Sequence, residues 1–586
     1  MTGLDEAKKS SVKAILQSFQ EGEESDYHRL LLKLRSSKLE NEVLLNLLNQ
    51  LQDAAILITS QCESLVVTIL HLQWAHYDAE LQQEYMKLLV KLASAQPTYL
   101  HHIVQMLASS FSPETILKQS QGSEILMKAN SWLELRYAAI HSTIQALMNA
   151  IPITPEHLFK ALRNHLPQIS AQHEIQEAYI KNLFHVTRYL PNLRKDILEI
   201  VVNRITEIDV HCPQSDIWVS SDEEEDVDEE MEQTQFDMDD VSAQGEMDAS
   251  KNETETTIPE GPRLSEIAVA LDRLMFAILT FCKETFYDDG DINHQNATSL
   301  LLQLLQVFGR IVLPTHSSHH VQYCLFYMAS LKKSFADAFL DYLWKQFVNP
   351  NTGSMIRQSS ASYMASFLSR ANFISLGIIT ASLELMAKWV HSYIDNQELS
   401  SQVKQDVNIH RPFYTLCQAM FYVIVYHYKD LLGSEKGNKF VMSLNLDRII
   451  SCKLNPLSYC LPSIVNIFAT ITRKYQVVFC YTIIERNARV CNVAQYQSSG
   501  FKKLIDLNNP LDTFFPFDPY LLPKSGEFID SLYKQWEGTD LQQKSQSTQP
   551  EDEEDEFRIY EAHLQEVPLG LMPSSLSAVS PGFMSP

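Results

Sequence analysis

The fold is decided by the stretch AELQQEYMKLLVKLASAQPTYLHHIVQMLASSF, residues 79–111. On both sides of Pro97, apolar residues recur at positions i, i+3, i+4 and i+7, which places them on one face of a helix. Proline cannot continue a helix from the residues before it, so the stretch divides into two amphipathic helices. Neither helix can bury its apolar face alone. The sequence therefore predicts that paired helices are the building unit of the chain.

The same pattern extends outward from this stretch in both directions. Before it lie DYHRLLLKLRS, SKLENEVLLNLLNQLQ and ESLVVTILHLQW, and after residue 262 the pattern resumes with RLSEIAVALDRLMFAILTFCKE. A partial repeat is visible when prolines serve as anchors, because apolar residues stand 2, 6, 7 and 10 positions after both Pro97 and Pro191. We predict an all-α fold, a HEAT-repeat-like α-solenoid of about ten helix pairs.

The composition agrees with a helical protein. Only 16 of 586 residues are glycine, so glycine-rich phosphate loops and tight hairpins are scarce. No apolar run approaches the roughly 20 residues of a membrane span, and the first residues, MTGLDEAKKSSVKAILQ, lack a signal-peptide core. The nine cysteines form no CxxC pair and are interpreted as buried thiols in a reducing compartment.

The formal net charge of −25 is concentrated in two segments. Residues 214–260 hold 18 carboxylates against Lys251, and residues 549–566 hold 8 against Arg558, so the rest of the chain is nearly neutral. Acidic segments of this kind bury too little apolar surface to offset the entropy of ordering, and we expect them to be disordered. A strongly basic nucleic-acid-binding face is not predicted, although direct contact of a local patch with DNA stays open.

These observations divide the chain into five parts. We predict an N-terminal solenoid half over residues 1–213, an acidic disordered loop over 214–262 and a C-terminal solenoid half over 263–508. A segment rich in proline and aromatic residues follows over 509–540, and an acidic tail containing Ser-Pro pairs over 541–586.

Residues 509–525, NPLDTFFPFDPYLLPKS, cannot form a helix because they contain four prolines. Phe514, Phe515, Phe517 and Tyr520 supply large apolar faces that an extended segment can bury along its path. We predict that the segment runs back over the C-terminal repeats as a strap, because the end of an open helical array exposes apolar surface. The alternative is a docking peptide for another protein, which would use the same extended conformation.

The most tempting site for chemistry is THSSHHVQYC, residues 315–324. The possible metal ligands in it are His316, His319, His320 and Cys324. Zinc requires three or four converging donors, and no second pair with ligand spacing lies nearby. The favoured interpretation is a helix start capped by Thr315 or Ser317, with the histidines at the surface or at a packed helix end. No metal site is predicted.

Two other motifs lead to the same negative result. YDDGDIN, residues 287–293, lacks the glutamate at the twelfth position of a calcium loop and favours a turn followed by a helix cap. GSEKGNKF, residues 433–440, lacks the spacing of a phosphate-binding loop. We therefore predict no catalytic residues, no cofactor and no enzymatic activity.

Several serines are candidates for regulation or binding. Ser220 and Ser221 directly precede a carboxylate run, the pattern that acidophilic kinases favour, and Ser580-Pro581 suits a proline-directed kinase. On the N-terminal helices, serines recur at 94, 109, 110 and 112. They form either a plain solvent face or a flat uncharged surface for a partner, which a single phosphate would disrupt.

Four stretches together carry a family resemblance. They are LPTHSSHHVQYCLFY (313–327), FLSRANFISL (367–376), LNPLSYCLPSIVNIFATITRKYQVVFCYTIIERN (454–487) and NPLDTFFPFDPYLL (509–522). In this order they closely resemble the RNA polymerase I-specific transcription initiation factor TIF-IA family. The similarity extends over roughly residues 25–540 and is strongest after residue 310.

The resemblance implies a non-catalytic HEAT-repeat protein. Such a factor binds the stalk of RNA polymerase I and bridges the enzyme to the promoter-bound core factor at ribosomal RNA genes. Family members work in the nucleolus, and phosphorylation by protein kinases regulates the contact. The family's serine-rich polymerase-binding surface corresponds to Ser94, Ser109 and Ser110. No membrane association is implied.

Two regions differ from relatives, and their regulatory sites are not transferred. The first is SQGSEILMKAN, residues 120–130, which stands where relatives carry an acidic, serine-containing insertion. The second is SAQHEIQ, residues 170–176, which lacks the hydroxyls found there in some relatives. The competing interpretation is another α-solenoid scaffold such as a transport receptor. That class would show a strongly acidic solenoid, whereas here the acidic residues lie in the loop and the tail. A metal-dependent enzyme built on the histidine cluster is the third hypothesis.

Overall fold

The computed structural model describes residues 11–36, 40–113, 123–213, 217–219, 263–288, 290–316, 318–399, 405–497 and 515–536. Phe514, Ser220, Ser221 and Ser580 lie outside the described residues, as do most of the two acidic segments. Within the described residues the fold is all-α, as the sequence predicted, and the strands are only two residues long. Apart from Trp536, every described residue belongs to one compact unit.

The first run of helices covers the chain up to residue 210. Its α-helices are α2 Val12–Gln20, α3 Ser25–Arg35, α4 Asn41–Asp53, α5 Glu63–Leu70, α6 Ala79–Ala95, α7 Leu100–Ser109, α9 Ser123–Ala150, α10 Thr154–Asn164, α11 His173–Tyr189 and α12 Arg194–Val210. The 3-10 turns are η1 Ala55–Leu57, η2 Ser60–Cys62, η3 Trp74–His76, η4 Pro97–Tyr99 and η5 Pro191–Leu193. Both anchor prolines thus begin a 3-10 turn that leads directly into the next helix.

The second run begins after the acidic segment. Its α-helices are α13 Glu266–Phe286, α14 His294–Val307, α15 Tyr323–Leu331, α16 Lys333–Val348, α17 Ser354–Arg370, α18 Leu376–Glu398, α19 Val407–Tyr426, α20 Tyr428–Leu432, α21 Glu435–Ser443, α22 Leu446–Ser451, α23 Pro462–Lys474, α24 Tyr481–Gln497 and α26 Pro523–Gly526. A π-helical turn, η7 Phe308–Val312, ends α14, and the 3-10 turns η8 Pro456–Ser458 and η9 Asp530–Leu532 complete the run.

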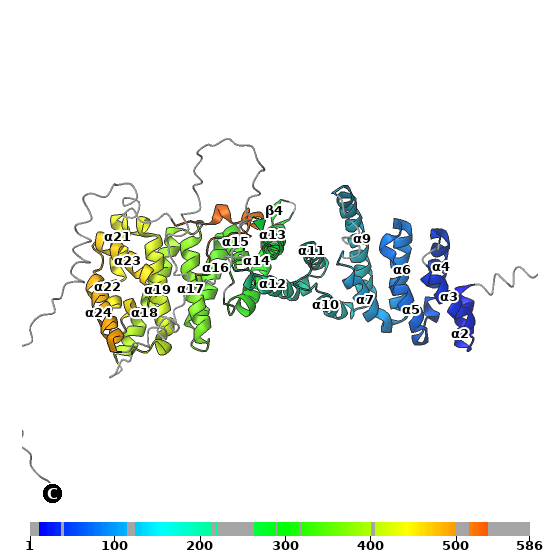
Figure 1. Cartoon of the computed structure of the whole chain (residues 1–586), viewed down its shortest axis with the longest axis horizontal. Helices are drawn as coiled ribbons and strands as arrows, with labels where there is room; N and C mark the ends of the chain where they lie inside the picture. The colour runs from blue at the N-terminus through cyan, green and yellow to red at the C-terminus, as the bar shows by residue number, and fades with distance from the viewer. Residues whose placement is uncertain are drawn as a thin grey trace, which may run out of the picture. The chain divides into compact units, whose positions relative to one another are not determined.

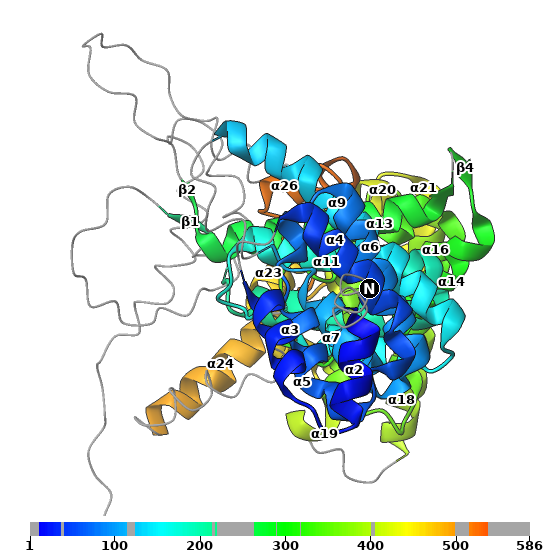
Figure 2. The same ribbon diagram turned by 90° about the vertical axis from the view of Figure 1, so that its right-hand side faces the viewer.

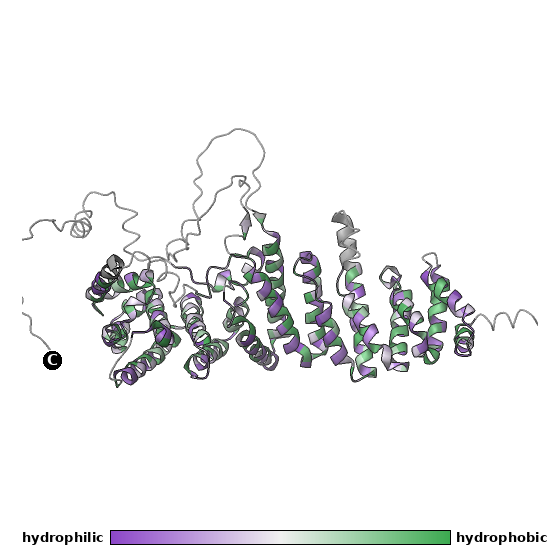
Figure 3. Ribbon diagram, turned by 60° about the horizontal axis from the view of Figure 1, so that its bottom comes forward, coloured by the Kyte–Doolittle hydropathy of each residue, from purple (hydrophilic) through white to green (hydrophobic). Residues whose placement is uncertain are grey.

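Alternate helices pack against one another, so the helices form two rows (Figure 1). One row contains α2, α4, α6, α9, α11, α13 and α15, each in contact with the next. In the other row α3 contacts α5, α7 contacts α10, and α12, α14 and α16 follow. Figure 3 shows apolar and polar positions alternating along most helices, as amphipathic helices require. A helix of this fold therefore buries its apolar stripe mainly against near neighbours in sequence.

Helix α19 is the most deeply enclosed helix of the second run. Every residue from 412 to 426 is buried, because α17, α18 and α23 surround it. On its neighbour α17, Ser360 and Ala361 are fully buried, and α17 makes its most extensive contacts with α19 and α16. Arg357 near the start of α17 donates from Nε to the Phe347 carbonyl at 2.6 Å. The small side chains of Ser360 and Ala361 thus allow the neighbouring helices to approach α17 closely.

Two short hairpins depart from the helical pattern. β1 Trp218–Val219 pairs antiparallel with β2 Arg263–Leu264, across the acidic segment. β3 Tyr287–Asp288 pairs with β4 Asp291–Ile292, with Gly290 at a φ of 92° in the turn. Asn293 then caps α14 by accepting a hydrogen bond from the Asn296 amide. Residues 287–293 therefore form the turn and helix cap that the sequence favoured over a calcium loop.

The run VVFCYTII, residues 477–484, has a continuous apolar pattern but is only partly helical. Residues 477–480 have no regular structure, and α24 begins at Tyr481. Gln476 before them adopts a positive φ of 55°, which ends α23 and redirects the chain. Val478 and Cys480 are buried by tertiary contacts rather than by a helical face.

The histidine stretch is built around a buried carboxylate. Asp209 near the end of α12 is fully buried and accepts hydrogen bonds from the amides of residues 319, 320 and 321 at 2.9–3.0 Å. Its other oxygen accepts from Nδ1 of His320 at 2.9 Å. Of the two predicted caps, Thr315 is wrong, because its hydroxyl donates to the Ile311 carbonyl and α15 begins only at Tyr323, and Ser317 lies outside the described residues. The carboxylate of Asp209 performs the capping instead.

The segment after residue 514 lies along helices of the second run. Phe517 is fully buried, and its amide donates to the Ser366 hydroxyl of α17 at 3.0 Å. Phe515 stacks on Tyr422 of α19 with ring centroids 4.3 Å apart. Both views in Figures 1 and 2 show α26 beside α13.

A buried carboxylate holds the middle of this segment in place. Asp272 of α13 accepts hydrogen bonds from the amides of Lys524 and Ser525 at 2.9 and 2.7 Å. The hydroxyl of Ser525 donates to the same carboxylate at 2.5 Å. Three donors from one short turn therefore converge on a single side chain.

Backbone hydrogen bonds join the end of the segment to the end of α17. The Lys534 amide donates to the Arg370 carbonyl at 2.7 Å, and the Asn372 amide donates to the Leu532 carbonyl at 3.1 Å. A single antiparallel β-bridge between residues 371 and 533 lies beside them. The segment therefore lies on α13, α15, α17 and α19 rather than on the last helices, α23 and α24.

We predict that Asp209→Ala lowers the free energy of unfolding by about 3 kcal/mol or more, because it leaves buried amides and His320 without their acceptor. Urea unfolding followed by circular dichroism measures the change. The matched control is Asp341→Ala, whose carboxylate is 58% exposed and pairs with Lys345 one turn away. A surface pair of this kind contributes at most about 1 kcal/mol. Equal losses in the two variants would contradict the role of Asp209.

Candidate functional site

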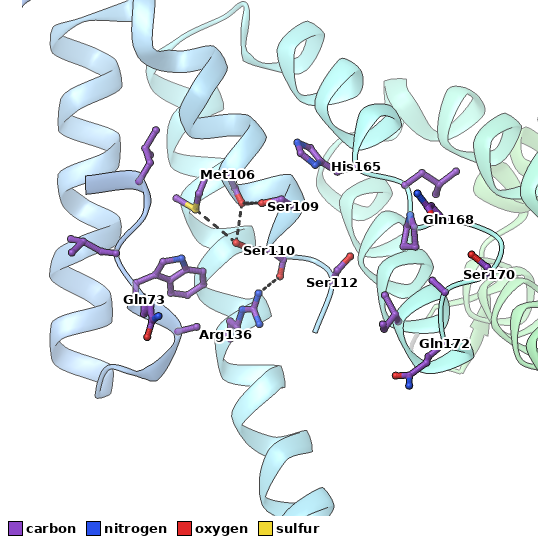
Figure 4. A pocket seen from close by; sticks show the side chains of 18 residues that line it. Gln73, Met106, Ser109, Ser110, Ser112, Arg136, His165, Gln168, Ser170 and Gln172 are labelled. Carbon is purple, nitrogen blue, oxygen red and sulfur yellow. Dashed lines mark hydrogen bonds between the residues drawn. The ribbon is translucent and has the colours of Figure 1, made fainter. Parts of the chain in front are cut away.

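A groove of about 1040 Å³ lies in the first helical run (Figure 4). One wall is the end of α5 and the turn η3, and the floor is formed by the end of α7 and by α9. The loop 165–172 between α10 and α11 forms the opposite wall.

Two of the predicted serines lie in this groove. Ser109 is the last residue of α7 and Ser110 is its C-terminal cap. Their hydroxyls both donate to the Met106 carbonyl, at 2.8 and 2.9 Å, which closes the last turn of the helix. Ser112 lies beside them, and Ser170 faces them from the opposite wall.

Ser94 is not part of the groove. It lies exposed in the last turn of α6, next to the corner at Pro97, and its hydroxyl donates to the Val90 carbonyl at 2.7 Å. Ser109 stands at the far end of α7, so the helix α7 separates the two. The structure therefore brings together Ser109 and Ser110 but not Ser94.

The lining of the groove is almost free of formal charge. Around the serines it presents amides and apolar groups, including Gln73, Gln168 and Gln172. The one residue with a permanent charge among those lining it is Arg136 of α9. His165 also lines the groove, and burial lowers the pKa of its imidazole, which favours the neutral form.

Two smaller hollows continue the groove along the same helices. A hollow of about 530 Å³ shares Leu72 and Gln73 with it, and one of about 540 Å³ shares residues 170–172. Together they give a continuous concave surface from α3 to the start of α13. Such a surface suits a protein partner better than a small molecule.

A neutral histidine supports the floor of the groove. His141 of α9 is 2% exposed and packs against Phe111, which follows the serines. Its Nε2 donates to Oδ1 of Asn182 at 3.0 Å, and its Nδ1 accepts from the Tyr189 hydroxyl at 3.0 Å. Burial, together with nearby His185, lowers the pKa of His141 to about 4. The floor thus rests on an uncharged, fully hydrogen-bonded imidazole.

Sequence reasoning did not identify Arg136, Trp74 or the loop 165–172 as part of a site. A single arginine in an amphipathic helix carries no spacing signal, and the groove assembles residues about 100 positions apart. The only sequence signal was the group of serines at the end of one helix.

The described residues contain no group of three or more histidine, cysteine or acidic side chains that could hold a metal ion. His320 is instead bonded to Asp209, and Cys324 is buried with its pKa raised by desolvation. Among the same residues, no helix is both long and apolar enough to cross a membrane. Paired helices with a concave face are typical of proteins that bind other proteins.

Comparison with known proteins gives the particular family. The family model of the RNA polymerase I specific transcription initiation factor RRN3 matches residues 4–540, and the chain belongs to this family. The family consists of transcription initiation factors and not of enzymes. The match favours the initiation-factor interpretation over the transport-receptor alternative.

Individual relatives agree with this assignment. The mouse RNA polymerase I-specific transcription initiation factor RRN3 is 35% identical, over 96% of this chain and 87% of its own length. The fission yeast (Schizosaccharomyces pombe) factor rrn3 is 26% identical, over 88% of this chain and 82% of its own. The crystal structure of RNA polymerase I transcription initiation factor Rrn3 superposes with a TM-score of 0.68 at 20% identity, covering 90% of this chain and 97% of that one. The last comparison supports the fold.

The buried imidazole of His141 makes stability depend on pH. Between its unfolded pKa near 6.5 and about 4, the unfolded chain binds a proton at this position and the folded chain does not, so stability falls as the pH falls. We predict that the contribution of His141 to the free energy of unfolding is about 1 kcal/mol smaller at pH 6 than at pH 8. The urea midpoints of the wild type and His141→Gln should therefore differ less at pH 6 than at pH 8. A constant difference between wild type and His141→Gln at the two pH values would contradict the prediction.

Proposed function

We propose that this protein acts as an RNA polymerase I transcription initiation factor that binds the polymerase through the groove containing Ser109 and Ser110. The carrying observation is the groove itself, a hollow of about 1040 Å³ that is lined by serine hydroxyls and amides. The names of its relatives associate them with RNA polymerase I. Ser94 belongs to this proposal only as a peripheral contact, because it lies outside the groove.

The uncharged character of the groove gives regulation a physical basis. Hydroxyls lose little free energy when they are desolvated in an interface and find new hydrogen-bond partners there. A phosphate adds about −1.5 to −2 charges, and its desolvation in a closed interface is unfavourable. Phosphorylation of Ser109 or Ser110 would therefore block the contact. Ser220, Ser221 and Ser580 remain proposed kinase sites of the acidic segment and the tail.

We further propose that the two rows of helices form a HEAT-like α-solenoid. The supporting observations are the packing of alternate helices and the 3-10 turns that begin at Pro97 and Pro191. A solenoid offers separate surfaces to separate partners. In this proposal one surface binds the polymerase stalk, another binds the promoter-bound core factor, and the protein bridges the two in the nucleus, at the nucleolar ribosomal RNA genes. Such a bridge requires no DNA contact by this chain.

The segment 509–540 is proposed to be an intramolecular strap and not a docking peptide. Supporting this, Phe515 and Phe517 are 3% and 0% exposed, and Tyr520 makes ring contacts with His320 and Tyr323. Groups that are already buried against the chain's own helices are not available to a partner without local unfolding.

The proposed function predicts that the wild-type protein co-elutes with purified RNA polymerase I and not with polymerase II. In Ser109→Asp/Ser110→Asp, the affinity for polymerase I should fall about tenfold or more, equivalent to about 1.4 kcal/mol, because two carboxylates must be desolvated. Size-exclusion co-elution and a titration by interferometry measure this.

The matched control is Ser142→Asp, which adds a negative charge at an exposed position of α9 outside the groove. It should bind as wild type does. Retained binding by the double variant would move the contact to another surface. Absence of binding to polymerase I by wild type, phosphorylated or not, would overturn the proposed function.

The strap proposal predicts that Phe517→Ala lowers the free energy of unfolding by about 3–5 kcal/mol, as truncation of a fully buried phenylalanine does. Limited proteolysis should then cleave within residues 509–536 at a protease concentration that leaves wild type intact. Phe479→Ala, at a side chain 64% exposed, is the control and should behave as wild type. A docking peptide would give the opposite result for Phe517→Ala, namely unchanged stability with lost binding of polymerase or core factor.

A further inference from the structure

Arg136 is a buried cation for which the fold provides no negative partner among the residues that the structure describes. The residue is 5% exposed, and one of its nitrogens, Nη2, donates to the Ser110 carbonyl at 2.5 Å. Its Nε and Nη1 have no hydrogen-bond partner in the described part of the chain. The guanidinium carbon lies 5.4 Å from the centre of the Trp74 ring, a cation–π contact that orients it without neutralising it. Two donors of a desolvated cation are therefore left unused.

An unused buried donor is unfavourable by about 1–3 kcal/mol, and more for a charged group. Arg194, another buried arginine of this protein, is better satisfied. It is 6% exposed and donates to Gln303 and Ser299 at 2.7 and 2.8 Å and also to Asn296. Burial lowers the pKa of both guanidinium groups, so the difference between the two arginines lies in their hydrogen bonds. Arg136 differs from Arg194 in that it lines the floor of an open groove (Figure 4).

We propose that Arg136 is the receptor for a single carboxylate, an aspartate or glutamate side chain of the protein that docks in the groove. The charge balance selects this ligand. Arg136 is the one permanently charged residue in the lining, so one carboxylate leaves the closed interface neutral. A phosphate would leave excess negative charge there. Charge-assisted hydrogen bonds to a carboxylate would satisfy the free nitrogens.

This receptor deepens the proposed function, on which it rests, and gives the groove a specificity determinant. The hydroxyls and amides around Arg136 accept many polar partners, whereas a desolvated arginine discriminates strongly against a surface that offers no acid. It also adds a second reason for inhibition at Ser110. A carboxylate or phosphate on residue 110 lies next to the guanidinium and would compete with the incoming side chain.

The first test compares the affinity of the full chain for purified RNA polymerase I in wild type, Arg136→Gln and Arg136→Met. We expect a loss of about tenfold to a hundredfold in both variants, the range of a charge-assisted hydrogen bond. Their melting temperatures should equal or exceed that of wild type, because a buried charge without a partner does not stabilise the fold. A purely structural arginine would give the reverse, a lowered melting temperature with unchanged affinity, and that result would overturn the proposal.

The matched control is Arg188→Gln on α11, whose side chain is 63% exposed, pairs with Glu284 and lies outside the groove. Its affinity should match that of wild type. A Glu114→Gln/Glu124→Gln variant tests two carboxylates of this chain that are close in sequence to the ends of α7 and α9. If it reproduced the effect of Arg136→Gln, the carboxylate would belong to this chain and the partner assignment would be wrong.

A second test needs no polymerase and so separates this inference from the proposed function. Sodium acetate is titrated against wild type and Arg136→Gln at constant ionic strength, with acetamide as the neutral analogue, and tryptophan emission and melting temperature are followed. We expect acetate, and not acetamide, to change the emission or raise the melting temperature of wild type only. Trp74→Phe should remove the emission change. Identical acetate responses in wild type and Arg136→Gln, including no response in either, would overturn the carboxylate receptor even if the polymerase binds.

Discussion

The structure depends on two buried carboxylates that accept hydrogen bonds from the backbone of distant segments. Asp209 of α12 holds residues 319–321, more than 100 positions later, and Asp272 of α13 holds residues 524 and 525, about 250 positions later. Helix packing in this fold is otherwise local, because each amphipathic helix contacts its near neighbours. A buried carboxylate is tolerated only where donors surround it, so each aspartate specifies one position for an irregular segment that has little helical packing to fix it. These two side chains thus add long-range hydrogen bonds to a fold whose helix packing is mainly local.

The all-α fold could be predicted from the sequence because it rests on local signals. The 3.6-residue spacing around Pro97, the scarcity of glycine and the proline-aromatic segment are all visible within short windows. What could not be predicted depends on contacts between distant residues. Thr315 has the right chemistry for a cap, yet the amides of residues 319–321 are satisfied by Asp209 from another helix. The run 477–484 has a continuous apolar pattern, yet its first half is not helical because a positive φ at Gln476 breaks the helix.

In the candidate site, too, residues with a local sequence signal could be predicted and residues that depend on distant contacts could not. Ser109 and Ser110 could be found because they end a recognisable helix, and Ser94 was grouped with them because it has the same residue type on a neighbouring helix. They are separated because Ser94 lies in the last turn of α6, before α7 begins, whereas Ser109 and Ser110 lie at the far end of α7. Arg136 was missed because its importance lies in a missing partner, and the absence of a carboxylate from the described lining of the groove is visible only when that surface is assembled. An unpaired buried cation at this position makes the fold less stable than an apolar residue would. The same cation makes binding in the groove more selective, so stability and binding favour different residues here.

The antiparallel pairing of β1 with β2 has a consequence for how the chain can change over evolutionary time. These two-residue strands bring the chain back to where it left α12, so the 43 residues from 220 to 262 enter and leave at one point of the helical rows. For a chain closed at a fixed point, each doubling of length adds only about 0.6 kcal/mol of closure entropy. Insertions and deletions between β1 and β2 therefore keep α12 packed against α13 and change the free energy of folding only slightly. This position can gain or lose acidic residues and phosphorylation sites from one lineage to the next, while the helices on either side keep their register.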